Sequence, residues 1–246
     1  MKTLKFELSG DFAFFKIPDI NSNVLFSYGQ IHKVALIGMI GATLGLGGYS
    51  ERGNDAFPEF YSKLKDLPVA IIPRNEGGYI EKYIHTYNNS TGHASREDGG
   101  NLIVTEQLLL NPKWIIYIGL KDDELSKNIE KTFATQQFKF IPYLGKNDCF
   151  ADIQNIEILD LEEVEDVKVI NSIYYYDDFE IKAKKISRAD TSKEYFYKED
   201  FPIGLSSLTN HYIMKLFAYT NKKVKKVNSA VTVFRDNKAE LNMCFI

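Results

Sequence analysis

The chain has 246 residues, enough for one large domain or two small ones, because domains usually hold about 100–200 residues. Its 30 Lys and Arg against 33 Asp and Glu give a net charge of −3, which excludes a uniformly basic nucleic-acid coat but allows a local basic patch. The two cysteines, Cys149 and Cys244, are too few for a disulfide framework or a four-ligand zinc site. We therefore expect a reducing, cytoplasmic setting.

The first residues predict no export signal, because Lys2, Lys5 and Glu7 place charges where an apolar run is needed. The longest uncharged apolar stretch covers residues 34–48, and its fifteen residues are fewer than the roughly 20 that cross a bilayer. This stretch is expected to be a buried helix, and no membrane partner is predicted.

The first two predicted elements have clear periodicities. Residues 2–9 alternate between apolar and polar side chains, which predicts a half-buried strand. Residues 32–45 carry apolar side chains three and four positions apart, which predicts a helix that ends at Gly45. Gly38 and Gly41 inside this helix each cost about 1 kcal/mol relative to Ala. We interpret them as packing glycines that allow another segment to approach the helix closely.

The elements that follow complete a recognisable order. A loop over residues 88–101 consists of turn formers and charges, and loops of this length are usually functional or mobile. Through about residue 155 the order is β-α-β-β-α-β, that of the ferredoxin-like or RNA-recognition fold. The predicted segments are a helix over 54–67, strands over 67–72, 78–87, 104–110 and 112–120, a helix over 122–135, and strands over 138–144 and 150–159.

The remainder of the chain is predicted to be β-rich. An acidic run over residues 157–166 is expected to be a solvated connection or an edge strand between the two parts. The sequence therefore predicts an α+β protein, with a ferredoxin-like domain over residues 1–158 and a smaller β-rich C-terminal region over 159–246. Within that region we expect strands over 167–176, 179–186, 229–236 and 239–246, and a short helix over 205–217.

The sequence lacks the usual catalytic motifs. It has no G-x-x-x-x-G-K-[ST] phosphate loop and no G-x-S-x-G nucleophile elbow. The surroundings of its four histidines do not have the spacing of a metal site. We therefore predict no catalytic residues, no metal and no cofactor.

A group of polar residues precedes and begins the glycine-containing helix. His32 and Lys33 start the helix, and helix N-termini attract anions through their free N–H groups. A cation, an amide, hydroxyls and an aromatic ring within a dozen residues suit an RNA backbone with a splayed base. The alternative is an ordinary capped helix with Lys33 exposed to solvent. The preceding members of the group are Ser22, Asn23, Ser27 and Tyr28.

Further basic residues are candidates for phosphate contacts. Arg96 lies in the long loop, Lys113 precedes the single Trp, and Lys146 is followed by Asn147. Lysines are also dense over residues 182–188 and 222–226, where alternating Lys equally serves as a guard against strand pairing at a sheet edge.

Three blocks of sequence resemble the CRISPR-associated protein 5 family. The first is NVLFSY at 23–28 leading into HKVALIGMIGATLGL at 32–46, the second is EQLLLNPKWIIYI at 106–118, and the third is PYLGKND at 142–148. They occur in the family's order, whereas residues 160–246 show no such match. The type I-B branch is the nearest in general character.

This resemblance implies a subunit of the type I CRISPR surveillance complex, Cascade, which acts in antiviral defence. Such a subunit holds the 5′ handle of the CRISPR RNA in an RNA-recognition-like domain and caps the backbone filament. It implies a hairpin thumb inserted at about residues 86–104, with the backbone and large subunits as partners and target DNA as an indirect one. The expected RNA-binding residues are Ser22, Asn23, Ser27, Tyr28, His32, Lys33, Arg96, Lys113, Lys146 and Asn147.

Two other functions remain open at this point. One branch of the family cuts precursor CRISPR RNA without metal, and Tyr28, His32 and Lys33 supply the acid, base and cation types that such a cut needs. Their spacing does not reproduce the family's motif, so a non-catalytic RNA-binding role is favoured over a metal-independent endoribonuclease. The third possibility is a protein-interaction module whose aromatic side chains all lie in the core.

Overall fold

A computed structural model of the protein describes residues 1–20, 23–90, 92, 96–182 and 193–246. Ser22, one of the expected RNA-binding residues, lies outside the described residues, as does most of the lysine-rich segment at 182–188.

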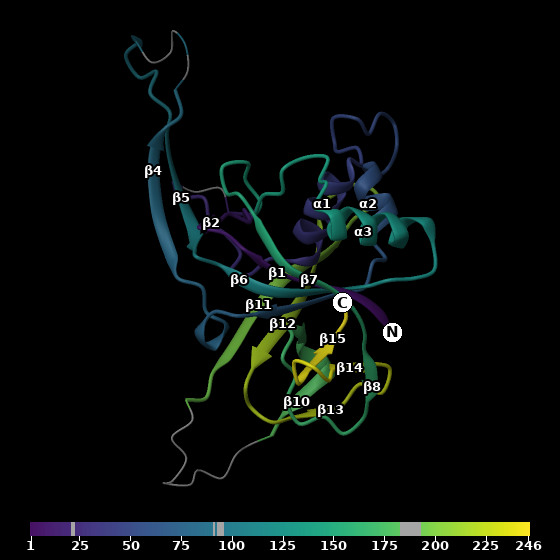
Figure 1. Ribbon diagram of the computed structural model, residues 1–246. Coiled ribbons are helices and arrows are strands. Elements are labelled where there is room, and N and C mark those ends of the chain that lie inside the picture. Colours follow the sequence, from purple (N-terminus) through teal and green to yellow (C-terminus); the bar gives the residue numbers. More distant parts are fainter. Residues whose placement is uncertain (21–22, 91, 93–95, 183–192) are drawn as a thin grey trace.

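A four-stranded antiparallel sheet forms the centre of the molecule (Figure 1). Helices α1 (Lys33–Leu44) and α3 (Glu124–Thr135) connect its strands in the order β-α-β-β-α-β and pack on one face of the sheet. The predicted α+β, ferredoxin-like fold is therefore confirmed. The spatial order of the strands is β3 (Val69–Pro73), β6 (Lys113–Gly119), β1 (Lys2–Ser9) and β7 (Asp152–Asp160).

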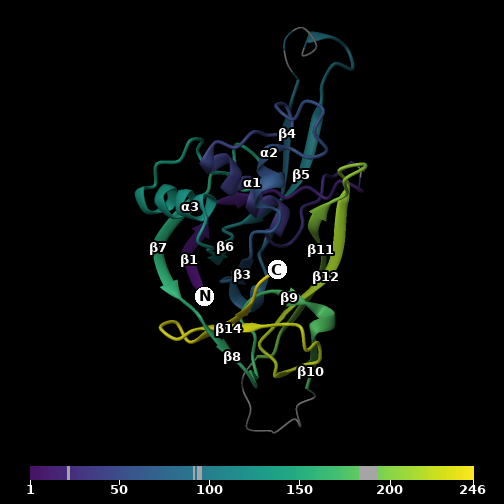
Figure 2. The same cartoon turned by 90° about the vertical axis from the view of Figure 1, so that its right-hand side faces the viewer.

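A long hairpin, which we call the thumb, is inserted between β3 and β6. It is formed by β4 (Lys82–Asn88) and β5 (Ile103–Leu110), with the short strand β2 (Phe12–Ala13) paired to its base. The thumb projects well beyond the body of the protein in both ribbon views (Figures 1 and 2). It is longer than the span of about 86–104 expected from the sequence, because its paired strands begin at Lys82 and end at Leu110.

The C-terminal region contains strands that pack against the central sheet. Its longest element is the hairpin of β11 (Phe196–Leu205) and β12 (Tyr212–Thr220). The other elements are β8 (Glu162–Val164), β9 (Tyr174–Tyr175), η3 (Tyr176–Asp178), β10 (Phe179–Ile181), β13 (Val224–Lys226), β14 (Val233–Asp236) and β15 (Leu241–Cys244).

Several predicted elements differ from the structure. The expected strand over 138–144 is a loop in which only Tyr143 forms a bridge, to Phe150. The expected helix over 205–217 is wrong, because these residues form the turn and the start of β12, and Asn210 has the left-handed φ of 55°. The expected strand over 167–176 is reduced to β9. The apolar run over 205–217 fits a helix and a strand equally well, and its pairing with β11 makes it a strand. Helix α2 (Glu59–Leu64) lies between α1 and β3 and is shorter than the predicted helix over 54–67. The short turn η1 (Glu76–Gly78) follows β3.

Elements pack on both faces of the central sheet. One face packs against α1 and α3, and the other packs against the C-terminal region through Tyr117, Leu161 and Met243. RNA-recognition domains usually stack bases on aromatic side chains of the open sheet face. Here β3 and β6 are buried on that face, although Glu7 of β1 remains exposed. The Tyr117 ring on this face is therefore not available to stack with a base.

An ionic cluster joins the covered face to the C-terminal region. Lys5 Nζ lies 2.9 Å from Asp236 Oδ2, and the Tyr117 hydroxyl donates a hydrogen bond of 2.8 Å to the same oxygen. Burial of Asp236 opposes its ionisation, but the hydrogen bonds from Lys5 and Tyr117 outweigh burial and hold the pKa of this carboxyl below its usual value.

We expect Asp236→Asn to lower the free energy of unfolding by about 2 kcal/mol at pH 7, because it removes a charged hydrogen-bond acceptor from a buried pair. A carboxyl with a depressed pKa stabilises the fold above its unfolded pKa of about 3.9 and loses this effect as the pH falls through the folded pKa. The deficit of the variant should therefore shrink in urea titrations below pH 4. Asp122→Asn, at an almost fully exposed carboxyl, is the control, and equal losses in the two variants would contradict the prediction.

Candidate nucleic-acid interface

The N-terminus of α1 is capped by the side chain of the residue that precedes the helix. His32 is the N-cap, and its Nδ1 accepts a hydrogen bond of 3.3 Å from the Ala35 N–H. The imidazole is only 2% exposed and is surrounded by the ring edges of Phe15, Tyr28 and Tyr212, with centroid separations of 6.1, 5.2 and 5.5 Å. This burial lowers the pKa of His32 to about 3, so the ring is neutral at neutral pH.

The neighbouring hydroxyl groups are also used inside the fold. Ser27 Oγ accepts the Phe15 N–H at 3.0 Å and donates to the Tyr28 carbonyl at 2.8 Å. Tyr28 is buried, its hydroxyl lies 3.9 Å from Met214 Sδ, and burial raises its pKa to about 12. Both residues fix the turn that leads into α1.

Lys33 is not the solvent-exposed cation that its position at a helix start predicts. Its Nζ donates a hydrogen bond of 3.0 Å to the main-chain oxygen of Ile246, and burial lowers its pKa. The expected open cluster of Ser27, Tyr28, His32 and Lys33 is therefore wrong as a surface feature. Two of the three residues named for the metal-independent endoribonuclease are affected by this burial: His32 is neutral and engaged as a cap, and Tyr28 has a raised pKa, which makes both poorly suited to proton transfer at neutral pH.

Four of the other expected residues are exposed, namely Asn23, Arg96, Lys113 and Asn147. The segment that contains Asn23 runs alongside β5, where the Leu25 N–H donates to the Thr105 carbonyl at 2.9 Å. Asn147 is exposed in the loop next to Lys146. Arg96 is exposed in the connection at the far end of the thumb, and Lys113 is exposed at the start of β6.

Lys146 connects the loop after α3 to the thumb. Its Nζ lies 2.7 Å from Glu106 Oε2, 3.2 Å from the Tyr87 hydroxyl and 4.6 Å from the centre of the Tyr87 ring. Burial opposes the charge of Lys146, but the hydrogen bonds and the charge of Glu106 outweigh it and raise the pKa of the lysine. Lys146, expected as an RNA-binding residue, is therefore held by a buried carboxylate, and Asp148 is a further partner at 3.3 Å.

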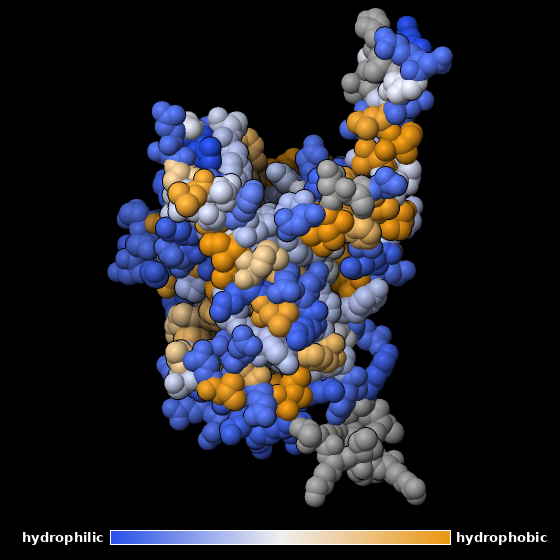
Figure 3. All heavy atoms as spheres, turned by 180° about the vertical axis from the view of Figure 1, so that it is seen from behind, coloured by the Kyte–Doolittle hydropathy of each residue, from blue (hydrophilic) through white to orange (hydrophobic). Residues whose placement is uncertain are grey.

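Aromatic rings form a row along one side of the thumb, which we call the thumb ladder. It consists of Phe12, Tyr83, His85 and Tyr87, with centroid separations of 6.2, 6.3 and 5.4 Å between successive rings. Tyr83 is 47% exposed. Apolar surface on the shaft of the thumb is also visible from behind (Figure 3). Phe12, His85 and Tyr87 are half-buried, so Tyr83 is the ring of this row that is most open to stacking with an unpaired base.

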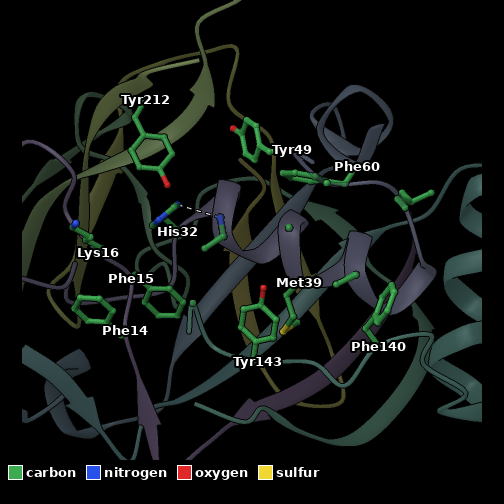
Figure 4. Close-up of a pocket in the computed structure, with 16 residues that line it drawn as sticks. Phe14, Phe15, Lys16, His32, Met39, Tyr49, Phe60, Phe140, Tyr143 and Tyr212 are labelled. Atoms are coloured by element: carbon green, nitrogen blue, oxygen red, sulfur yellow. Dashed lines mark hydrogen bonds between the residues drawn. The ribbon is translucent and has the colours of Figure 1, made fainter. Parts of the chain in front are cut away.

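A hollow of about 650 Å³ opens over the exposed side of α1 (Figure 4). Gly38 and Met39 of α1 belong to its floor, and Tyr49, Tyr143 and Tyr212 belong to its walls. These tyrosines come from the loop after α1, the loop after α3 and strand β12, which lie far apart in the sequence.

The glycines of α1 have different roles. A Cβ on Gly41 would lie 2.5 Å from the Phe60 Cβ of α2, so the packing interpretation is confirmed at this position. Gly45 has the left-handed φ of 75° that ends the helix. A Cβ on Gly38 would meet only the far end of the Phe60 ring, at 3.7 Å, so the packing interpretation is wrong for Gly38. Gly38 instead leaves space in the floor of the hollow.

The thumb ladder and the hollow were not predicted from the sequence. Tyr83, His85 and Tyr87 occupy alternate positions of a predicted strand, and that spacing places them on one face, so they could have been found. The hollow could not have been found, because its tyrosines meet only through the tertiary fold. Among the described residues, no group of three or more His, Cys, Asp or Glu has a geometry suited to a metal ion. In the same part of the chain, each helix is too short or too polar to cross a bilayer.

No protein-family model matches the sequence, and no curated protein matches it. Among solved structures, the chain is similar to one from a "CRISPR RNA-guided surveillance complex", with 13% identity, coverage of 92% of this chain and 91% of that chain, and a TM-score of 0.53. It is also similar to a CRISPR protein from Archaeoglobus fulgidus, with 9% identity, coverage of 100% and 98%, and a TM-score of 0.53. The chain thus has an RNA-recognition-like fold with an inserted thumb. At these identities, the similarity establishes the shared fold.

Proposed function

We propose that this protein is a non-catalytic, RNA-binding subunit of a type I CRISPR surveillance complex and a member of the CRISPR-associated protein 5 family. In this role it holds the 5′ handle of the CRISPR RNA, caps the backbone filament and contacts the backbone and large subunits. The single observation that carries the proposal is the fold similarity, which extends over at least 91% of this chain and of both CRISPR proteins.

The surface of the protein supports RNA binding away from the sheet. The C-terminal region covers β3 and β6 on the sheet face where RNA-recognition domains usually bind, whereas the thumb ladder presents Tyr83 to solvent. The three sequence blocks that resemble the family include α1, β5 with β6, and the loop that carries Lys146. These segments surround the base of the thumb and the hollow over α1.

The charge distribution favours a contact made largely through bases. Of the four cations expected from the sequence, Lys33 and Lys146 are bound to groups within the chain, which leaves Arg96 and Lys113 exposed. Lys16, which lines the hollow, is a further exposed candidate for a phosphate contact. The number of phosphates neutralised sets the slope of affinity against salt concentration. We therefore expect a shallow salt dependence.

We expect Tyr83→Ala to weaken binding of the RNA that co-purifies with the protein by about tenfold, because loss of one base stack costs roughly 1–3 kcal/mol. Tyr83→Phe should restore binding, since it retains the ring. The affinity is measured by filter binding with the full chain and a synthetic copy of that RNA. Tyr79→Ala, at a tyrosine that is 62% exposed but outside the thumb ladder, is the matched control. Equal effects of Tyr83→Ala and Tyr79→Ala would contradict the role of the ladder.

A further inference from the structure

The hollow over α1 is a second surface feature, and none of its lining residues belongs to the thumb ladder. Its floor is open because Gly38 has no side chain, and a Cβ there would approach only the Phe60 ring, at an ordinary contact distance of 3.7 Å. A glycine inside a helix costs about 1 kcal/mol relative to Ala. Here that cost brings no closer packing of the helix, whereas at Gly41 it allows contact with α2. The space above Gly38 is therefore the structural consequence of this residue.

The walls of the hollow are aromatic and partly exposed. Tyr49 is 54% exposed, Phe140 is 58% exposed and Tyr143 is 41% exposed, although each contributes to a concave surface. Figure 4 shows their rings arranged around the floor formed by α1, with the Tyr212 hydroxyl directed towards His32. Ligand sites are typically concave and lined by apolar and aromatic side chains with a few polar groups, and have volumes of about 300–1,000 Å³.

The charge of the hollow distinguishes between possible ligands. Among the described residues that line it, Lys16 alone is charged, because the buried imidazole of His32 is neutral. Since His32 Nδ1 accepts the Ala35 N–H, Nε2 carries the proton of the neutral ring, and no described residue accepts a hydrogen bond from it. Phosphate binding is favoured by several cations, and Lys16 is the one cation among the described lining residues. A flat, neutral heterocycle with hydrogen-bonding edges fits this lining better.

We infer that the hollow over α1 receives a single nucleobase turned out of the bound RNA strand, with tyrosine rings stacking against it and the floor at Gly38 providing the space. This inference rests on the proposed RNA-binding function and identifies a base-specific contact within it. The thumb ladder would then contact the strand by stacking, and the hollow would accommodate one base at a defined position.

The test combines filling of the hollow with removal of single bases. The RNA that co-purifies with the full chain is sequenced, and synthetic copies are made in which each nucleotide in turn is abasic. With the wild-type protein, one position should lose about ten- to hundredfold in affinity. Gly38→Leu places a side chain in the hollow, so it should weaken binding of the intact RNA by a similar factor and abolish the additional effect of that one abasic position. A thermal melt establishes that Gly38→Leu is folded, and Tyr143→Ala, which removes a wall instead of filling the floor, provides a second variant.

Ala134→Leu is the matched control, because it adds the same side chain on the exposed side of α3, outside the hollow. It should retain the wild-type affinity and the wild-type abasic profile. If the wild-type chain binds RNA but no abasic position is coupled to Gly38→Leu or Tyr143→Ala, the base-binding role is refuted while the proposed function stands. Normal RNA binding with loss of a protein subunit from the Gly38→Leu complex would also refute it and would assign the hollow to a protein side chain. Absence of RNA binding by the wild-type chain would refute both.

Discussion

Replacement of Gly41 by Leu is expected to lower the free energy of unfolding by about 3 kcal/mol, because an overpacked core contact forces neighbouring side chains and backbone to move. Even the first carbon of a side chain would lie 2.5 Å from Phe60 Cβ and 3.6 Å from Leu64 Cδ1. Phe60 Cβ is fixed to the backbone of α2 and cannot rotate away. The two helices must therefore separate, and α1 must lose part of its packing.

Gly38→Ala is the matched comparison in the same helix. Its added carbon meets only the edge of Phe60 at 3.7 Å, so it should raise the free energy of unfolding by up to about 1 kcal/mol through helix propensity. Urea titrations of both variants measure the difference. Losses of similar size at the two positions would mean that Gly38 also packs closely, and would remove the structural basis of the hollow.

Replacement of Lys146 by Ala is expected to destabilise the fold by about 3 kcal/mol, because it leaves the carboxylate of Glu106 buried without its cation. Glu106 is only 4% exposed, and its other partner is the Tyr87 hydroxyl at 3.1 Å. The loop that carries Lys146 should detach from the thumb, so RNA binding should decline together with stability. Replacement of a surface lysine that contacts phosphate would instead weaken RNA binding without destabilising the fold.

The double variant Lys146→Ala with Glu106→Gln separates these two roles. The neutral amide that Glu106→Gln introduces does not require a cation, so the double variant should recover more than half of the stability that Lys146→Ala loses. Lys113→Ala, at an exposed lysine outside the cluster, should change the free energy of unfolding by less than about 0.5 kcal/mol. A double variant as unstable as Lys146→Ala would show that the lysine acts through packing and not through the buried charge.

The periodic elements of the first part of the fold were predictable from sequence. The alternation over residues 2–9 and the three-and-four spacing over 32–45 identified β1 and α1 to within a residue or two, because both elements bury one side of a regular pattern. The hairpin of β11 and β12 was not predicted, since its apolar residues fit a helix as well as a strand. Only pairing across the sheet, such as Phe217 opposite Glu199, distinguishes the two.

The candidate site was less predictable than the fold. A polar residue at a helix start is normally solvated, so His32 and Lys33 were expected to be available, but Tyr212 covers His32 and the main chain at Ile246 binds Lys33. Both contacts join residues that lie far apart in the sequence. Lys146 was found, but its partner Glu106 could not be assigned before the thumb was placed. The positions of the charged residues in the sequence therefore did not reveal which cationic side chains are free to contact RNA.

The location of RNA on the assembled complex tests the account most directly. The complex is purified with its own RNA and irradiated, and the crosslinked peptides are identified by mass spectrometry. We predict crosslinks at the thumb ladder, with Tyr83 among them, and at the walls of the hollow, with Tyr143 or Tyr212 among them. Crosslinks confined to the acidic segment 157–166 or to strands β10 and β13, with none on the thumb or around α1, would contradict it.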